Sequence, residues 1–211
     1  MKHLIRFVLC LSLAGCASGE PGVARLVARA LPAPTGVAAA DYAALRRSGA
    51  TTMIFANEAA GTSAEFVEVT SRGGTQSWRN EGNLGVVTRD GFLLATRGLG
   101  HDAMAIDPGA AVALVLAGNS GVSQRVHEEL DGDDHLIRKS YACTVENRGP
   151  RDIAIGAHDV ATRLMAETCT GGAGPGFTNL YWVRSGRVLQ ARHWVSAGFG
   201  TLAMRAPSGR G

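Results

Sequence analysis

Carboxylates and imidazoles, the groups that bind cations and transfer protons, gather in one short segment between His127 and His135. Glu128 and Glu129 stand at its start, and the run Asp131-Gly132-Asp133-Asp134 follows. Such side chains could hold a divalent cation, but their spacing lacks the calcium-loop pattern that ends in a bidentate Glu. Asp and Gly together are typical of turns between strands. We therefore predict a solvated hairpin tip here and no metal site.

Two further patterns resemble catalytic arrangements. His101 is followed by Asp102, and a carboxylate on one ring nitrogen can orient a histidine that acts as a base. Neighbouring residues of an extended chain point in opposite directions, so we expect an ordinary surface loop. The sequence Gly118-Asn119-Ser120-Gly121 lacks the Gly-x-Ser-x-Gly spacing of a nucleophile elbow and is typical of a turn. We predict no catalytic residue and no cofactor.

The aromatic residues favour binding over catalysis. They comprise all three tryptophans of the chain and a tyrosine, with arginines near them. Aromatic rings stack on sugars and on partner side chains, and arginine gives charge-assisted hydrogen bonds to acidic groups. The predicted glycan-binding or partner-binding residues are Trp78, Arg97, Tyr181, Trp182, Arg184, Arg192 and Trp194. The alternative is that these large rings fill the core of the domain.

The N-terminus predicts an exported lipoprotein. Lys2 and Arg6 precede an apolar run that is too short to span a bilayer, since about 20 apolar residues are needed. The run ends in Leu-Ala-Gly-Cys at 13–16, which resembles the bacterial lipobox. We therefore expect a signal peptide at 1–15 and acylation of Cys16 as the attachment to membrane lipid. Ala17 follows, and by resemblance to the sorting rule for such proteins it favours the outer membrane.

The chain after Cys16 predicts a tether and one domain. Residues 16–40 are rich in Ala, Gly and Pro without apolar periodicity, which is typical of a tether, and a single periplasmic domain is expected at 41–211. Cys143 and Cys169 would both enter an oxidising compartment, so we expect a disulfide between them. Two separate buried thiols are the alternative. No Cys-x-x-Cys spacing suggests zinc or redox chemistry.

The charge balance argues against nucleic acid as a partner. The chain has 21 Lys plus Arg against 18 Asp plus Glu, and Lys2 and Arg6 would leave with the signal peptide. Binding to phosphates needs a clustered basic surface, which a nearly neutral domain does not favour. With 28 glycines and few charges, the composition is typical of a turn-rich globular domain.

The elements that must position these residues are strands with a two-residue period. Asp90-Gly91 between apolar runs at 84–88 and 92–96 is the strongest hairpin signal. A short helix is expected at 41–47. Further strands are predicted at 51–55, 65–70, 111–116, 122–130, 136–146, 160–167, 178–183, 188–195 and 201–205. Their spacing of about ten residues, with Gly-rich turns between them, predicts an all-β antiparallel sandwich or barrel-like domain with little helix.

Two segments resemble the YjbF/GfcB (YmcC-like) family of outer-membrane lipoproteins. The sequence GFLLATRGLGHD at 91–102 resembles the family's Gly-x-aliphatic-x-x-Thr-x-Gly-Leu-x-x-Asp pattern. The sequence NLYWV at 179–183, followed by Gln190, His193 and Trp194, resembles its C-terminal Asn-x-Tyr-Trp and aromatic strand. The chain departs from the family at Phe92, where a basic residue is expected, and at Leu180, where Arg or Lys is common.

The resemblance implies a role in exopolysaccharide or capsule assembly and export, and it carries over no catalytic residue. The leading hypothesis is a non-catalytic, lipid-anchored accessory protein at the outer membrane whose domain binds a polysaccharide or a protein of the export machinery. One alternative is a periplasmic polysaccharide hydrolase or lyase, which would need two carboxylates about 5 to 9 Å apart. Its candidates are Glu128, Glu129, Asp131 and Asp102. Another alternative is a structural factor for envelope assembly.

Overall fold

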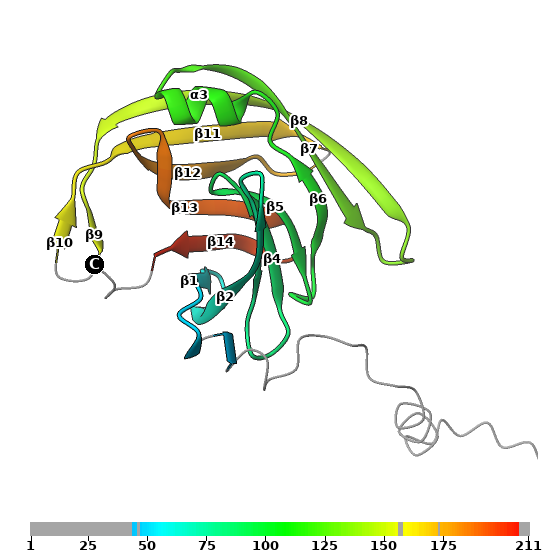
Figure 1. Cartoon of the computed structure of the whole chain (residues 1–211). Coiled ribbons are helices and arrows are strands. Elements are labelled where there is room, and N and C mark those ends of the chain that lie inside the picture. Colours follow the sequence, from blue (N-terminus) through cyan, green and yellow to red (C-terminus); the bar gives the residue numbers. More distant parts are fainter. Residues whose placement is uncertain (1–43, 46, 156–157, 173, 207–211) are drawn as a thin grey trace, which may run out of the picture. The chain divides into compact units, whose positions relative to one another are not determined.

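The computed structural model describes residues 44–45, 47–155, 158–172 and 174–206 (Figure 1). The predicted signal peptide, Cys16 and the predicted tether lie outside these residues. Ala44, Leu45 and Arg47 are helical, and the N–H of Ser48 donates to the carbonyl of Ala44 at 3.0 Å. This is the end of the short helix that the sequence predicted.

One antiparallel sheet of 12 strands dominates the described part of the chain, in the order β5-β4-β3-β2-β1-β14-β13-β12-β11-β8-β7-β6. Its members are β1 (Thr52–Asn57), β2 (Thr62–Arg72), β3 (Thr75–Arg79), β4 (Gly85–Arg89), β5 (Phe92–Arg97), β6 (Ala103–Asp107), β7 (Gly121–Leu130), β8 (Leu136–Pro150), β11 (Arg163–Gly171), β12 (Phe177–Arg184), β13 (Arg187–Ser196) and β14 (Gly200–Arg205). The strands β9 (Ile153–Ile155) and β10 (His158–Val160) form a separate pair. The all-β antiparallel prediction is confirmed.

The sheet curves until its two edge strands, β5 and β6, lie side by side (Figure 1). Side chains bridge this seam. The Arg97 guanidinium donates to the carbonyls of Ala103 at 3.3 Å and Met104 at 3.0 Å, and the N–H of Ala103 donates to Thr96 Oγ1 at 3.0 Å. The sheet is therefore a nearly closed barrel.

The hairpin predicted at Asp90-Gly91 is confirmed. Both residues have positive φ, 52° and 85°, and Arg89 pairs with Phe92 across the turn. Positive φ at both central positions is the requirement of the tight hairpin turn that Asp-Gly favours.

The strand predicted at 111–116 is wrong. Ala111–Ala117 form the helix α3, which buries Ala111 and Val115. Ala and Leu favour helix, and a short apolar run carries too little periodicity to separate a helix from a buried strand. Gly118, with φ 74°, ends the helix in the left-handed conformation, where its N–H reaches the carbonyl of Val115 at 3.1 Å.

Other strands also differ from the sequence prediction. The strand expected at 160–167 begins only at Arg163, because Val160 belongs to β10 and pairs with Ile153. Strands β3 and β6 were not predicted. Trp78 is the one large apolar residue of β3, and the apolar residues of β6 form a continuous run without alternation. Trp78 on β3 is nevertheless 1% exposed, so a single ring fixes the inner face of that strand.

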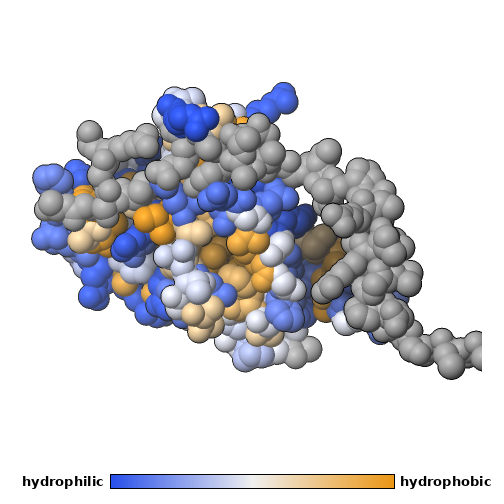
Figure 2. Space-filling model, turned by 90° about the horizontal axis from the view of Figure 1, so that it is seen from below, coloured by the Kyte–Doolittle hydropathy of each residue, from blue (hydrophilic) through white to orange (hydrophobic). Residues whose placement is uncertain are grey.

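Most buried apolar residues of the barrel meet in one main core, and Tyr141, Cys143, Cys169 and Phe177 form a second, smaller cluster. Phe55, Phe66 and Trp78 pack edge to face, with ring centroids 4.9 and 6.0 Å from Phe55, and Phe92 lies 4.6 Å from Tyr181. Seen from below, apolar residues gather in the middle of the described surface, with hydrophilic residues around them (Figure 2). This face is mixed in character and is not a continuous charged surface.

Candidate functional site

Ionisable and polar side chains occupy the interior of the sheet beside this core. Six of them are fully buried, with an exposed fraction of 0%. They come from four strands, of which β11 and β7 are separated by β8: Arg125 and His127 from β7, Glu167 from β11, Asn179 and Tyr181 from β12, and His193 from β13. Buried polar groups normally form hydrogen bonds with one another. Most polar atoms of this group do so, whereas Arg125 Nη2, His127 Nδ1 and His193 Nδ1 are buried without a hydrogen-bond partner among the described residues.

Glu167 is the centre of this network. Arg125 Nη1 donates to both of its carboxylate oxygens, at 2.8 and 3.1 Å. Asn179 Nδ2 and the Tyr181 hydroxyl each donate to Oε2 at 2.8 Å. A buried ion pair tolerates its desolvation only when further hydrogen bonds complete the shell of the carboxylate, and here two neutral donors do so.

The pKa values follow from this arrangement. Burial is the largest single effect on Arg125 and lowers its pKa. The charges of Glu167 and Tyr181 and the hydrogen bonds to both together outweigh burial, so the pKa rises above its usual value. Burial, and then the charge of Glu167, raise the pKa of Tyr181 well above its usual value. The arginine therefore stays charged and the tyrosine keeps its proton, so neither group is poised to transfer a proton near neutral pH.

Both buried histidines are neutral. Arg125 Nε donates to His127 Nε2 at 3.0 Å, which places the single ring proton of His127 on Nδ1. His193 Nε2 donates to the carbonyl of Gly91 at 3.0 Å. Burial, and then the charge of Arg125, lower the pKa of each ring to about 3.

The two segments that carry the family resemblance meet in this network. Asn179 Oδ1 accepts the N–H of Trp194 at 2.7 Å, while His193 reaches Gly91 at the other segment. The Asp102 carboxylate accepts from the Thr96 hydroxyl at 2.7 Å and from the N–H groups of Gly98 and Leu99 at 2.7 and 3.1 Å. These residues therefore hold a loop and a strand in place.

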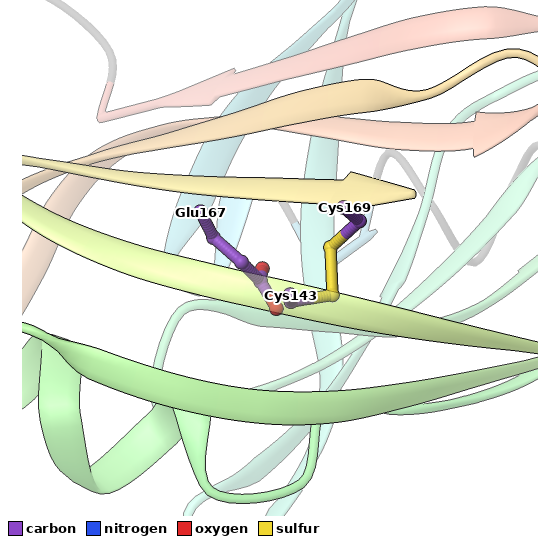
Figure 3. A group of neighbouring side chains, drawn as sticks. All are labelled: Cys143, Glu167 and Cys169. Carbon is purple, nitrogen blue, oxygen red and sulfur yellow. A yellow bond between two sulfur atoms is a disulfide. The ribbon is translucent and has the colours of Figure 1, made fainter. Parts of the chain in front are cut away.

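The predicted disulfide is present. Cys143 on β8 and Cys169 on β11 are directly opposite partners, joined by an S–S bond of 2.06 Å. Glu167 projects from the same strand as Cys169, beside the bond (Figure 3). Ligand atoms of these three residues lie within 4.8 Å of one another. Their donor set does not fit a metal, because metals bind thiolates, both sulfurs are in the disulfide, and Arg125 occupies the carboxylate.

The structure divides the predicted binding residues into two groups. Trp78 and Tyr181 are 1% and 0% exposed, so their rings fill the core and present no open face to a polymer. Trp182 and Trp194 are half-buried, and Arg184 is exposed. Arg97 is exposed at the seam, where it bridges β5 and β6. Arg192 pairs with the Glu58 carboxylate through two guanidinium nitrogens.

Three of the four carboxylates proposed for a hydrolase line one cavity of about 370 Å³, together with His101: Glu129, Asp102 and Asp131. Each of these carboxylates already has an ion-pair or hydrogen-bond partner in the protein. Lys139 Nζ lies 2.7 Å from Glu129, and Asp102 caps its loop. Backbone N–H groups of His135 and Asp133 hold the pKa of Asp131 below its usual value, whereas a general acid needs a raised pKa.

The acidic run after β7 is a hairpin tip, as predicted. The N–H of Asp131 donates to the carbonyl of His135 at 2.9 Å, and Asp131 Oδ1 accepts from the N–H groups of Asp133 and His135, each at 2.9 Å. Asp134 adopts the left-handed conformation, with φ 61°. The Asp131 carboxylate therefore stabilises this turn.

Sequence reasoning missed the buried network. Its signal was the alternation of Ser123, Arg125, His127 and Glu129 along β7, which places all four on one face. Polar alternation normally marks the solvent side of a strand, but all four residues are buried. Among the residues described above, no helix is long and apolar enough to cross a membrane.

Fold and network together define a class of protein: a disulfide-linked, barrel-like β-domain with a sealed polar interior. The chain belongs to the YjbF family, described as the group 4 capsule polysaccharide lipoprotein gfcB, YjbF, whose model matches residues 37–206. The crystal structure of the hypothetical lipoprotein YmcC from Escherichia coli (K12) has the same fold, with a TM-score of 0.67 and 21% identity. That similarity covers 92% of this chain and 99% of YmcC. No curated protein matches significantly.

Proposed function

We propose that this protein is a non-catalytic, lipid-anchored accessory of capsule or exopolysaccharide assembly and export at the outer membrane. The observation that carries the proposal is the family match, which spans the whole described domain and names a capsule polysaccharide lipoprotein. In this account acylated Cys16 holds the protein to the membrane, residues 16–40 act as a tether, and the single domain from residue 41 faces the periplasm. The domain binds the polysaccharide or a protein of the export machinery.

The chemistry of the interior supports a role without catalysis. Arg125, Glu167 and Tyr181 are buried and bonded to one another, and the two buried histidines are neutral. These groups stabilise the strands and do not face a substrate. A second candidate function, polysaccharide hydrolysis or cleavage by a lyase, draws on the cavity that collects Glu129, Asp102 and Asp131.

The anchor is tested with Cys16→Ser. We expect the variant to remain unprocessed or to become soluble in the periplasm, because acylation needs the cysteine thiol. The measurement is membrane fractionation after a high-salt wash, with the wild-type protein as the control. Persistent association of the variant with the outer membrane would contradict the lipoprotein assignment.

The non-catalytic role is tested by incubating the purified protein with the polysaccharide of its source cells and measuring polymer length. We expect no change in length over many hours. Shortening that is lost in Glu129→Gln would replace the accessory function with the hydrolase or lyase.

A further inference from the structure

A cavity of about 380 Å³ opens at one end of the barrel, between the β2–β3, β4–β5 and β12–β13 turns. We call it the turn-end cavity. Gly74, Gly91 and Gly186, one from each turn, line it together with Leu116 of α3. Its volume lies within the range of about 300 to 1,000 Å³ that is usual for small-molecule sites, and such sites often lie in the mouths of β-barrels.

The inner wall of the turn-end cavity is apolar and firmly held. Met53, Trp78, Val188 and Met204 contribute to it. The Trp78 indole Nε1 donates to Thr88 Oγ1 at 2.9 Å, which fixes the ring. Gly91 lets the β4–β5 turn close on Val188, because a Cβ at Gly91 would stand 2.5 Å from the Cβ of Val188. An apolar wall suits the C–H face of a sugar ring.

The rim of the turn-end cavity is polar and charged. Asp90 and Arg187 are exposed there, and Gln76 lies beside them. Gln76 Nε2 donates to Glu68 at 2.6 Å, which leaves the amide oxygen of Gln76 free to accept. The rim therefore combines a cation with two acceptors, a set that suits a carboxylate and hydroxyl groups on one ligand.

Arg187 of the rim has a second arginine, Arg184, next to it across the β12–β13 turn. Arg184 and Arg187 are direct cross-strand partners that flank the Ser185-Gly186 turn. Like charges directly opposite each other destabilise a strand pair. Neither guanidinium has an ion-pair partner within the ranges that the structure describes. Two arginines without an ion-pair partner, side by side at the turn, favour an anion.

We propose that the turn-end cavity binds a carboxylate-bearing sugar unit of the exported polysaccharide. Arg187, with Arg184 next to it, pairs with the sugar carboxylate, since guanidinium matches carboxylate geometry with two parallel hydrogen bonds. Asp90 and the amide oxygen of Gln76 accept from hydroxyl groups, and the ring lies over Met53 and Val188. This inference rests on the proposed function, because that function supplies the polysaccharide.

The first test is calorimetric titration of the full-length acylated protein in detergent with a tetrameric oligogalacturonate. Maltotetraose is the neutral ligand of the same length, and inorganic phosphate tests for a simple anion. We expect saturable binding of the acidic sugar and at least tenfold weaker binding of the other two. Equal binding of acidic and neutral sugars, or tighter binding of phosphate, would overturn the proposal.

Variants place the binding in the turn-end cavity. Arg187→Ala should weaken binding about tenfold or more, because it removes the charge-assisted hydrogen bonds to the carboxylate. Arg138→Ala removes the same charge from an exposed position on β8 and should change nothing. Ser71→Trp fills the exposed rim and should block binding without lowering the melting temperature. An equal loss in Arg138→Ala, or full binding in Ser71→Trp, would show that the sugar binds elsewhere.

Polymer export in cells separates this site from the proposed function. Deletion of the gene should reduce the exported polymer, and the double variant Arg184→Ala/Arg187→Ala should fail to restore it at wild-type protein levels. If the double variant restores export fully, the site is wrong and the accessory function stands. If the deletion leaves export unchanged, the accessory function itself is wrong.

Discussion

Acidification from pH 7 to pH 5 should destabilise this protein, because two histidines are buried as neutral rings. The pKa of His127 and that of His193 are both lowered to about 3 in the folded state. In the unfolded chain each ring has a pKa of about 6.5. Between these values the unfolded state binds a proton on each ring and the folded state does not. Stability is therefore complete above pH 6.5 and falls as the pH drops toward 3.

The magnitude follows from the same two values. At pH 5 the solution is about 1.5 pH units below the pKa of the unfolded ring. Protonation therefore stabilises the unfolded state by about 2 kcal/mol per histidine. Both rings together lower the free energy of unfolding by about 4 kcal/mol, a large part of the roughly 5 to 15 kcal/mol that holds a typical domain together. Most carboxylates titrate below this pH, so they add little to the change.

The assay is urea unfolding followed by tryptophan fluorescence at pH 7, 6 and 5. His193→Asn removes one buried ring and should show about half of the wild-type pH dependence. His158→Gln removes an exposed ring on β10 and serves as the matched control. A free energy of unfolding that stays constant from pH 7 to pH 5, or an unchanged dependence in His193→Asn, would refute the reasoning.

Three further perturbations probe the interior and its links. Replacing both Cys143 and Cys169 with Ser should lower the free energy of unfolding by about 3.5 kcal/mol, because the disulfide restricts the chain entropy of an unfolded loop with a sequence separation of 26. A loss below about 1 kcal/mol would mean that the disulfide contributes little to stability. Arg125→Met should cost about 3 to 5 kcal/mol because it leaves Glu167 buried without its cation, and adding Glu167→Leu should recover part of the loss. No recovery in that double-mutant cycle would contradict the pairing. Asp102→Ala removes three hydrogen bonds from the 96–102 loop and should lower stability by about 2 kcal/mol in thermal melts. The stability of Asp102→Asn should lie between that of Asp102→Ala and that of the wild type.

Local signals in the sequence were enough for the hairpins. Asp90-Gly91 has the residue types that positive φ favours, and Ser185-Gly186 has Gly at its second position. Both turns formed where the sequence placed them. The helix α3 was missed for the opposite reason. Its sequence AVALVLA is apolar throughout, so no period distinguishes its faces, and Gly118 is its clearest boundary.

The buried network could not be read from local patterns. Arg125 and Glu167 are 42 residues apart in sequence, and their pairing depends on β7, β8 and β11 lying side by side. Strand order is a property of the whole chain, so the sequence alone left Arg125 indistinguishable from a solvated residue. The disulfide was predictable only as an expectation from the compartment, because nothing local places Cys143 opposite Cys169.

The burial of the aromatic rings could not be predicted from local sequence either. Trp78 and Tyr181 form part of the core, whereas Trp182 and Trp194 are partly exposed, although all four are aromatic residues of strands. Which face a ring occupies depends on register. Tyr181 and Trp182 are neighbours on β12 and therefore point to opposite faces of the sheet.

The central claim, a lipid-anchored accessory of polysaccharide export, is tested most directly by cell-surface polymer yield in a deletion strain. The strain would be complemented at matched protein levels with wild type, with Cys16→Ser, and with Glu129→Gln/Asp131→Asn. The account predicts that the deletion loses exported polymer, that wild type and the carboxylate variant restore it, and that Cys16→Ser does not. Full export in the deletion strain, or failure of the carboxylate variant while it remains folded and membrane-bound, would contradict the account.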